Sequence, residues 1–319
     1  MSISMLIGGQ DVAALDGSTF DRLDPVTGEV ATTAPAAKAA DAQAAAKAAA
    51  AAFPAWSKTS PAERRAVLMK AADELEAMAP EIIAITTSET GATAPWTGFN
   101  CMLAAGMLRE AGAITTQITG EIIPANKPGT LAMAQRKPLG VCLGIAPWNA
   151  PIILGTRAVA TAIACGNTAI LKASELCPAT HLAIGEAFRR AGAPDGVMNV
   201  VTNAPEDAAE VVGALIAAPE VRHINFTGST GVGRIIAQTA ATHLKPVLLE
   251  LGGNNAMVVA PSADLDMTMR AVLFSAVGTC GQRCTTLRRL IAHESVVDDL
   301  VSKLVPAYQS IRIGNPRES

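Results

Sequence analysis

Five short apolar runs decide the fold: VCLGIA (141–146), TAILKA (168–173), VMNVVT (197–202), VRHINF (221–226) and PVLLEL (246–251). Helical stretches are readable between them at residues 179–191, 204–217 and 230–241. Strands that alternate with helices pair in parallel, because each connection must cross back over the sheet. The sequence therefore predicts an α/β protein with a doubly wound parallel sheet, which binds ligands at the carboxyl ends of its strands.

Two helices and a hairpin are predicted before this region. The Ala-rich residues 37–53 favour a helix, since Ala has the highest intrinsic helix propensity. Residues 60–78 predict a second helix, with Ser60 as its N-cap and Glu63 completing a capping box. The polar residues 117–136 contain two Pro and two Gly, which predicts an extended or hairpin excursion.

A second α/β unit is predicted after residue 251. It begins with a strand at 256–260 and a helix at about 265–277, and a strand at 286–293 and a helix from 295 follow. The sequence then reaches RIGNPRES (312–319) without a recognisable closing element. We therefore expect this second unit to be incomplete.

Composition narrows the class of protein. The 319 residues carry 25 basic and 28 acidic side chains, so the net charge of −3 gives no reason to expect nucleic acid or an anionic membrane as partner. The longest uncharged apolar stretch, 138–156, contains three Pro and one Asn, which is typical of a buried strand and turn rather than a membrane span. No two of the 6 Cys have zinc-knuckle or redox-dithiol spacing, the His residues are scattered, and no basic segment opens a signal peptide. We expect a soluble, cytoplasmic protein without a metal site.

The segment NFTGSTGVGRIIA (225–237) passes from a strand through a Gly-rich turn into a helix. Backbone amides at such a turn form an anion site, so Gly228, Ser229 and Gly233 are candidates for binding a pyrophosphate. The spacing is not the G-x-G-x-x-G fingerprint. Glycine used only for a tight turn is the alternative.

The segment LKASE (171–175) ends the second strand of the predicted sheet. An acidic residue in this place can accept hydrogen bonds from a ribose, and a nearby Lys can bond the same sugar. Glu175 would repel a 2′-phosphate, so Lys172 and Glu175 together favour NAD over NADP. A solvated Lys–Glu pair at a helix start is the alternative.

Three further residues have the chemistry for covalent catalysis: Cys284 in GQRCTT, Glu250 in LELGG and Asn149 in PWNAP. Thiolate attack on a carbonyl requires a nucleophile, a donor for the developing oxyanion and a base for the later attack by water. Residue spacing alone does not bring the three together, and each residue on its own is more often structural.

Taken together, the motifs resemble the NAD(P)-dependent aldehyde dehydrogenase superfamily. The motifs that carry the resemblance are PWN (147–149), LKASE (171–175), FTGST (226–230), ELGG (250–253) and GQRCT (281–285), in the family's order and spacing. The resemblance implies a Rossmann-like NAD-binding domain over residues 1–250, with 117–136 as a protruding oligomerisation hairpin. Residues 251–319 would begin the catalytic thiol domain.

The resemblance also implies roles for individual residues. Cys284 would attack the aldehyde and form a thiohemiacetal, Asn149 would hold its oxyanion, and Glu250 would activate water against the thioester. The cofactor would be NAD, with NADP less favoured. It would contact the ribose-binding pair Lys172 and Glu175, the turn residues Gly228, Ser229 and Gly233, and the wall residues Ile145, Pro147 and Trp148.

Substrate choice follows two branches of the family. Residues up to about 250 are similar to salicylaldehyde and vanillin dehydrogenases, and on that branch Trp96, Phe99, Met107 and Arg157 would surround an aromatic aldehyde. Residues from about 252 are more similar to the aminoadipate-semialdehyde branch, where Arg283 would clamp a distal carboxylate. We favour aromatic aldehydes. A non-catalytic dinucleotide-binding protein is a further alternative.

Members of the superfamily continue well beyond the equivalent of Ser319. By resemblance, the additional region supplies a Glu that holds the nicotinamide ribose and the last strands of the oligomer interface. A gene fragment, a joined assembly and a natural short form are all compatible with the sequence. A homodimer or larger oligomer is expected of the full-length family, and is less certain for these 319 residues.

Overall fold

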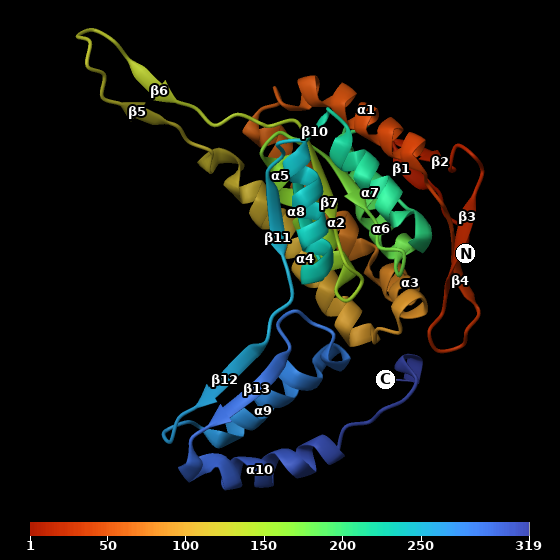
Figure 1. Ribbon diagram of the computed structural model, residues 1–319, viewed down its shortest axis with the longest axis vertical. Coiled ribbons are helices and arrows are strands. Elements are labelled where there is room, and N and C mark those ends of the chain that lie inside the picture. Colours follow the sequence, from red (N-terminus) through yellow and green to blue (C-terminus); the bar gives the residue numbers. More distant parts are fainter. Residues whose placement is uncertain (319) are drawn as a thin grey trace.

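The computed structural model describes residues 1–318 and is built around a seven-stranded sheet (Figure 1). The strand order is β11-β10-β7-β8-β9-β1-β2. The five apolar runs form the parallel strands β7 (Val141–Ile145), β8 (Thr168–Lys172), β9 (Met198–Val201), β10 (Val221–Thr227) and β11 (Val247–Glu250). Because β8 and β10 flank β7 on opposite sides, the chain reverses direction across the sheet at β7, where α/β sheets bind ligands. The predicted doubly wound sheet is confirmed.

Two short strands extend the sheet beyond the prediction. β1 (Met5–Ile7) pairs antiparallel with β9, and β2 (Gln10–Val12) pairs antiparallel with β1. The sheet is therefore mixed rather than purely parallel. Three-residue strands are too short to show a hydrophobic period, which is why the sequence did not indicate them.

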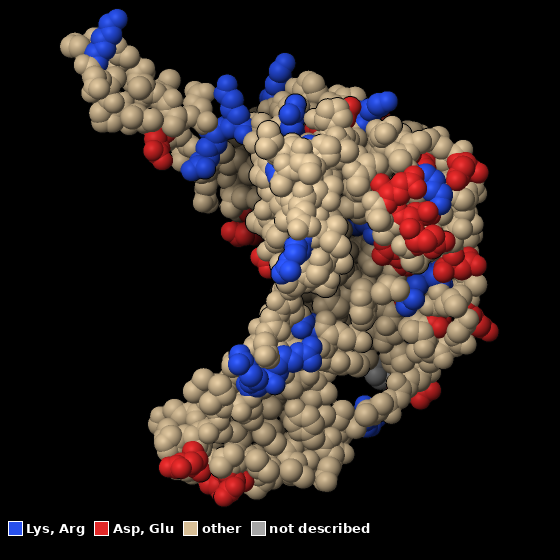
Figure 2. Space-filling view, in the orientation of Figure 1, with Lys and Arg blue, Asp and Glu red and all other residues tan. Residues whose placement is uncertain are grey.

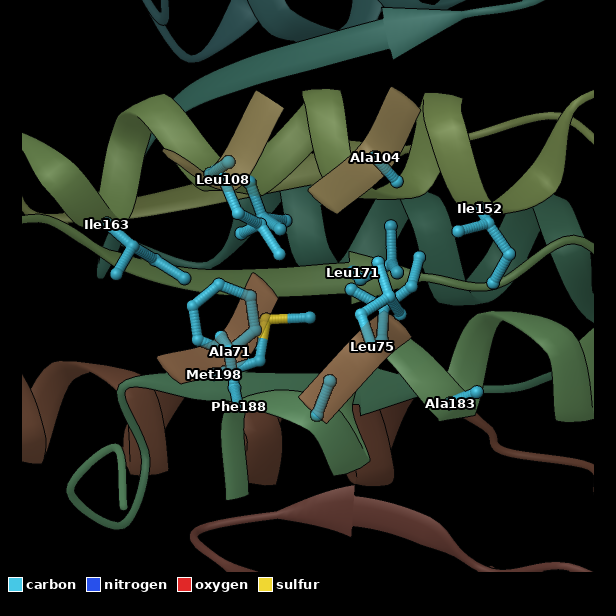
Figure 3. Packing of buried hydrophobic residues seen from close by; sticks show 14 of the residues in the cluster. Ala71, Leu75, Ala104, Leu108, Ile152, Ile163, Leu171, Ala183, Phe188 and Met198 are labelled. Atoms are coloured by element: carbon cyan, nitrogen blue, oxygen red, sulfur yellow. The ribbon is translucent and has the colours of Figure 1, made fainter. Parts of the chain in front are cut away.

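Helices cover both faces of the sheet. They are α1 (Ala39–Trp56), α2 (Pro61–Ala77), α3 (Ala79–Thr90), α4 (Ala94–Ala113), α5 (Pro151–Ala164), α6 (Pro178–Arg190), α7 (Ala208–Ala217) and α8 (Thr230–Thr242). Side chains alternate across a strand, so in β8 Ile170 belongs to one core cluster while Leu171 belongs to the other. The Leu171 cluster includes residues of α2, α4, α5 and α6 (Figure 3), and the Ile170 cluster includes residues of α1, α7 and α8.

The two helices predicted before the sheet are present, and the second begins as expected. The Ser60 hydroxyl accepts from the Glu63 N–H at 3.2 Å, and the Glu63 carboxylate accepts from the Ser60 N–H at 2.7 Å. Each bond satisfies a donor that the first turn leaves free, so the capping box fixes the start of α2.

Two hairpins extend from this body. β3 (Thr19–Leu23) pairs with β4 (Val30–Pro35), and β5 (Glu121–Ile123) pairs with β6 (Ala132–Ala134). The β5–β6 hairpin lies within the predicted residues 117–136 and projects away from the sheet (Figure 1). Its side chains Ile122 and Leu131 are 76% and 66% exposed. Its role in oligomerisation stays a prediction.

The remaining elements form a smaller lobe, defined here as residues 255–309, beside the larger lobe of residues 1–250 (Figure 1). It contains β12 (Asn255–Val259), α9 (Leu265–Val277), β13 (Leu287–Ala292) and α10 (Glu294–Gln309), and its two strands pair in parallel. Single turns of 3-10 helix complete the structure at η1 (Ile114–Gln117), η2 (Pro205–Asp207), η3 (Gly278–Gly281) and η4 (Pro316–Glu318). None of the helices within residues 1–318 has the length and apolar character that a membrane span needs.

Candidate active site

A cleft of about 530 Å³ opens at the carboxyl ends of β7, β8 and β10, with α7 and α8 as its side walls. Seven of the eight predicted cofactor residues line it: Ile145, Pro147, Trp148, Lys172, Glu175, Gly228 and Ser229. Most of the remaining lining is apolar, from side chains such as Val212 and Ile235. A long cleft with apolar walls and a few polar groups at its ends fits a dinucleotide.

The Gly-rich turn forms one end of this cleft. The Ser229 hydroxyl caps α8 by accepting from the Val232 N–H at 3.3 Å, and the Gly228 N–H donates to the Glu250 carbonyl at 3.0 Å. The helix N-terminus therefore faces the cleft with its positive end, as pyrophosphate binding requires. Gly233 does not line the cleft. A Cβ at Gly233 would lie 2.6 Å from a Leu251 methyl carbon, so packing favours glycine here, and its contact with the cofactor stays a prediction.

The ribose-binding candidates form an ion pair at the other end. Lys172 is buried and its Nζ contacts Oε1 of the half-buried Glu175. Burial opposes ionisation of Glu175, but the attraction of Lys172 outweighs it and lowers the pKa of the carboxyl. Asn203 Nδ2 donates to the same oxygen at 2.9 Å. Sequence reasoning missed Asn203, because a single Asn after a buried strand carries no distinguishing pattern.

His181 supports the same loop from behind. Its Nδ1 accepts the Ser174 N–H at 2.9 Å, and the imidazole also bonds the Pro151 backbone. Complete burial, with a further contribution from Lys172, lowers the pKa of His181 to about 3. The ring is therefore neutral and joins the loop of Glu175 to the start of α5, two residues after Asn149.

The thiol loop, residues 278–286, lies in the smaller lobe with Cys284 exposed. Asn255 Nδ2 donates to the carbonyl oxygens of Cys284 at 2.6 Å and Thr286 at 3.0 Å. The Arg283 N–H donates to the Thr286 hydroxyl at 3.1 Å. Among the hydrogen bonds of residues 1–318, none uses the Cys284 N–H, which leaves it as a donor beside the thiol. Asn255 is a second residue that sequence reasoning missed.

Asn149 reaches the thiol loop from the larger lobe. Its Nδ2 donates to the Gln282 carbonyl at 2.7 Å, two residues before Cys284, and its Oδ1 is buried without a partner in the described structure. The structure thus brings Asn149 and the Cys284 loop together. Glu250 ends β11, next to Thr227 of β10, with its side chain exposed.

The surroundings of the thiol loop are basic. Figure 2 shows Lys and Arg atoms gathered on the smaller lobe where it borders the hollow between the lobes. The exposed Arg288 and Arg289 of β13 donate to the Gly281 carbonyl at 3.0 Å and the Asn254 carbonyl at 2.9 Å.

Three predicted substrate residues, Trp96, Phe99 and Arg283, lie next to the contact between Asn149 and the thiol loop. The Trp96 and Phe99 rings of α4 are 5.6 Å apart, and Trp96 Nε1 donates to the Asn149 carbonyl at 3.2 Å. The Arg283 guanidinium lies 5.8 Å from the Trp96 ring and 4.5 Å from the Phe274 ring. It also contacts the carbonyls of Phe274 and Ser275. Both bonds use one guanidinium nitrogen, Nη2, and hold α9 against the loop, while Nε is buried without a partner in the described structure.

The other two substrate candidates lie farther away. Met107 is on α4, eleven residues after Trp96, which is about 16 Å along a helix. Arg157 is exposed on α5, with its guanidinium 3.5 Å from the Thr227 hydroxyl. Their roles toward a ring substrate stay predictions.

Comparison with known proteins agrees with this geometry. A sequence model of the aldehyde dehydrogenase family matches residues 12–319. The chain belongs to the aldehyde dehydrogenase family. It is 52% identical over 318 residues to a vanillin dehydrogenase of Pseudomonas fluorescens, covering 100% of this chain and 66% of that protein.

Solved structures give the same result. The chain superposes on a salicylaldehyde dehydrogenase from Pseudomonas putida G7 complexed with salicylaldehyde, with a TM-score of 0.98, 42% identity and coverage of 100% and 66% of the two chains. It also superposes on PnpE in complex with nicotinamide adenine dinucleotide, with a TM-score of 0.94, 35% identity and coverage of 99% and 64%. The chain thus spans about two thirds of the length of these relatives.

Proposed function

We propose that this aldehyde dehydrogenase oxidises an aromatic aldehyde to the carboxylate with NAD, using Cys284 as its nucleophile. The observation that carries the proposal is the hydrogen bond from the Asn149 amide to the Gln282 carbonyl, 2.7 Å across the two lobes. This bond holds the Asn149 amide, the proposed oxyanion donor, close to the loop that carries Cys284. Both lie beside the cleft that fits a dinucleotide. The likeness to vanillin and salicylaldehyde dehydrogenases supports the substrate class.

The first step is attack on the aldehyde, in which Cys284 supplies the nucleophile and Asn149 a donor for the oxyanion. The Cys284 thiolate attacks the aldehyde carbon, and the carbonyl oxygen becomes an oxyanion. An amide NH₂ carries two hydrogens, so Asn149 donates one to Gln282 and keeps the second for this oxyanion. The unused Cys284 N–H supplies another donor. NAD, when bound, supplies the hydride acceptor for the oxidation.

The second step releases the acid. The thioester on Cys284 is hydrolysed by water, which Glu250 activates as general base from the end of β11. Glu250 and Cys284 lie in different lobes, so the base has no direct bond to the thiol in the described structure and acts through water. The product is a carboxylate.

The aromatic pair Trp96–Phe99 supports a ring substrate. Flat side chains beside Asn149 offer a stacking surface for an aromatic aldehyde. The alternative substrate, an amino-acid semialdehyde, depends on Arg283, whose guanidinium already bonds backbone carbonyls of α9. We therefore retain the aromatic aldehyde.

The test is NADH formation by the purified chain with salicylaldehyde, vanillin, benzaldehyde and aminoadipate semialdehyde. Cys284→Ala serves as the blank. Turnover of ring aldehydes that disappears in the variant is expected. Turnover of the semialdehyde alone would overturn the substrate class. No Cys284-dependent NADH from any aldehyde would leave a dinucleotide-binding protein without this activity.

The role of Glu250 has a separate test. Glu250→Gln is expected to give a burst of NADH, close to one per thiol, followed by a steady rate about 10²-fold lower, because the thioester accumulates. Glu29→Gln, a substitution of an exposed carboxylate on another part of the larger lobe, is the matched control. An unchanged steady rate in Glu250→Gln would contradict the general-base role.

A further inference from the structure

Asn203 lies directly behind the ribose end of the cleft. It follows β9 by two residues, is completely buried and does not line the cleft. Its Nδ2 donates to Glu175 Oε1 at 2.9 Å and to the Ala204 carbonyl at 2.8 Å. Both amide hydrogens are therefore used, and one of them reaches a residue that does line the cleft.

The amide of Asn203 is not explained by packing alone. Its Oδ1 is buried and has no partner within residues 1–318. A buried amide that leaves its oxygen unpaired is unfavourable compared with an apolar side chain of similar size. The donated bond to Glu175 is thus the feature that this side chain contributes.

This bond fixes which oxygen of Glu175 is available. Lys172 and Asn203 both bind Oε1, and neither of them uses Oε2. The carboxylate is consequently held with one oxygen toward the protein, and Oε2 remains to accept from a hydroxyl in the cleft. The Lys172 ammonium is neutralised by the same arrangement.

We propose that Asn203 is a positioning residue that selects a dinucleotide with a free 2′-hydroxyl, an inference that rests on the proposed function. By holding Glu175 on Lys172, it keeps an acceptor facing the ribose and keeps the ammonium from pairing with a 2′-phosphate. Without the bond from Asn203, Glu175 turns toward solvent and Lys172 becomes available to a phosphate. Charge-assisted bonds of this kind are strong enough to change nucleotide preference.

The experiment measures binding of NAD and NADP to the whole chain by calorimetry and by quenching of Trp148, which lines the cleft. Asn203→Ala is expected to weaken NAD binding and strengthen NADP binding, so that the ratio of the two dissociation constants changes about tenfold. Asn203→Leu, which has about the same size but lacks the donor, is expected to change the ratio in the same direction and serves if the Ala variant does not fold.

Thr202→Val is the matched control. Thr202 is equally buried and adjacent, but its hydroxyl donates to the Pro35 carbonyl, away from the cleft. This variant is expected to lower stability without changing the NAD to NADP ratio. A change in ratio as large as that of Asn203→Ala would show a general packing effect and overturn the inference.

A double-mutant cycle with Glu175→Ala completes the test. If Asn203 acts through Glu175, then Asn203→Ala has no further effect on the ratio in the Glu175→Ala background. A full additive effect there would overturn the inference while leaving dinucleotide binding intact. Failure of the unaltered chain to bind either nucleotide would instead overturn the proposed function, and the inference with it.

Discussion

The two lobes differ in how completely they bury their own side chains. In the larger lobe, β7 and β8 are buried along their whole length, and two clusters of fully packed side chains cover both faces of the sheet. In the smaller lobe, the buried hydrophobic residues are Val259, Val272 and Leu300, while Val258 and Phe274 are 75% and 62% exposed.

The proposed reaction requires a cleft for the dinucleotide and a correctly placed thiol, and these two features lie in lobes that are held together differently. The cleft is built by strands and helices that have a closed core, so its geometry is set by packing. The thiol loop is held chiefly by polar contacts, from Asn255, Asn149 and Arg283. We therefore expect dinucleotide binding to depend on the larger lobe alone, and chemistry to be sensitive to single hydrogen bonds in the smaller one.

The largest expected effect tests the contrast in packing. Phe188→Ala, in the larger lobe, removes a fully buried ring and is expected to lower the free energy of unfolding by about 3–5 kcal/mol. Phe274→Ala should cost about 1 kcal/mol or less, mainly its contact with Arg283. Urea unfolding followed by circular dichroism measures both. Similar losses in the two variants would remove the contrast between the lobes.

The next effect concerns the thiol loop. Asn255→Ala removes the donor to the Cys284 and Thr286 carbonyls and is expected to lower kcat about 10²-fold, because the thiol loses its fixed position. NAD binding should not change. Asn254→Ala is the control, since within residues 1–318 its backbone oxygen accepts from Arg289 and its side chain makes no hydrogen bond. Weakened NAD binding in Asn255→Ala would show that dinucleotide binding does not depend on the larger lobe alone.

A pH effect is expected in the larger lobe. The pKa of His181 is about 3 in the folded chain against an ordinary 6.5, so below pH 6.5 the unfolded chain takes up a proton that the folded chain does not. Stability present above pH 6.5 is therefore lost on acidification, by up to about 1.4 kcal/mol per pH unit. His181→Gln keeps an acceptor for Ser174 and should show a flatter profile between pH 6.5 and 5. Identical pH profiles would contradict this origin.

The smallest effect concerns the link between the C-terminal segment and the larger lobe. Arg317 contacts the buried Asp24, whose pKa is lowered because the Val26 N–H and Arg317 outweigh burial. Arg317→Ala should cost at most about 1 kcal/mol at pH 7. Because a lowered Asp pKa stabilises the fold above its ordinary value of 3.8, the difference from the unaltered chain should shrink as the pH falls through 3.8 and vanish below the lowered pKa of the folded chain. Arg312→Ala is the control, and an equal loss there would contradict a specific pair.

Much of the larger lobe could be predicted from the sequence. Buried parallel strands appear as short apolar runs, and the start of α2 is encoded locally by Ser60 and Glu63. The β3–β4 hairpin was missed although its strands, Thr19–Leu23 and Val30–Pro35, pair locally. The strands β1 and β2 were missed because each has three residues and β1 pairs with β9, where Leu6 faces Val200. Such pairing leaves little local signal.

The candidate site shows the same division. Residues within motifs, such as Lys172 and Ser229, were found because a short pattern carries their chemistry. Asn203, His181 and Asn255 were missed because each acts on a segment that the fold brings to it. At Gly233 the structure adds a reason for glycine that the sequence did not show, the close approach of the Leu251 side chain.

The connection between β11 and β12 has a mechanical consequence. Glu250 is the last residue of the larger lobe, Cys284 belongs to the smaller lobe, and residues 251–254, with Gly252 and Gly253 exposed, join the two lobes along the chain. The distance between the Glu250 carboxylate and the Cys284 thiol therefore changes with the angle between the lobes at these residues, and the Asn149–Gln282 hydrogen bond restrains that angle. A displacement of about 1 Å in a catalytic group can cost about 10²-fold in rate. Deacylation therefore depends on the stiffness of a four-residue joint as well as on the two side chains it separates.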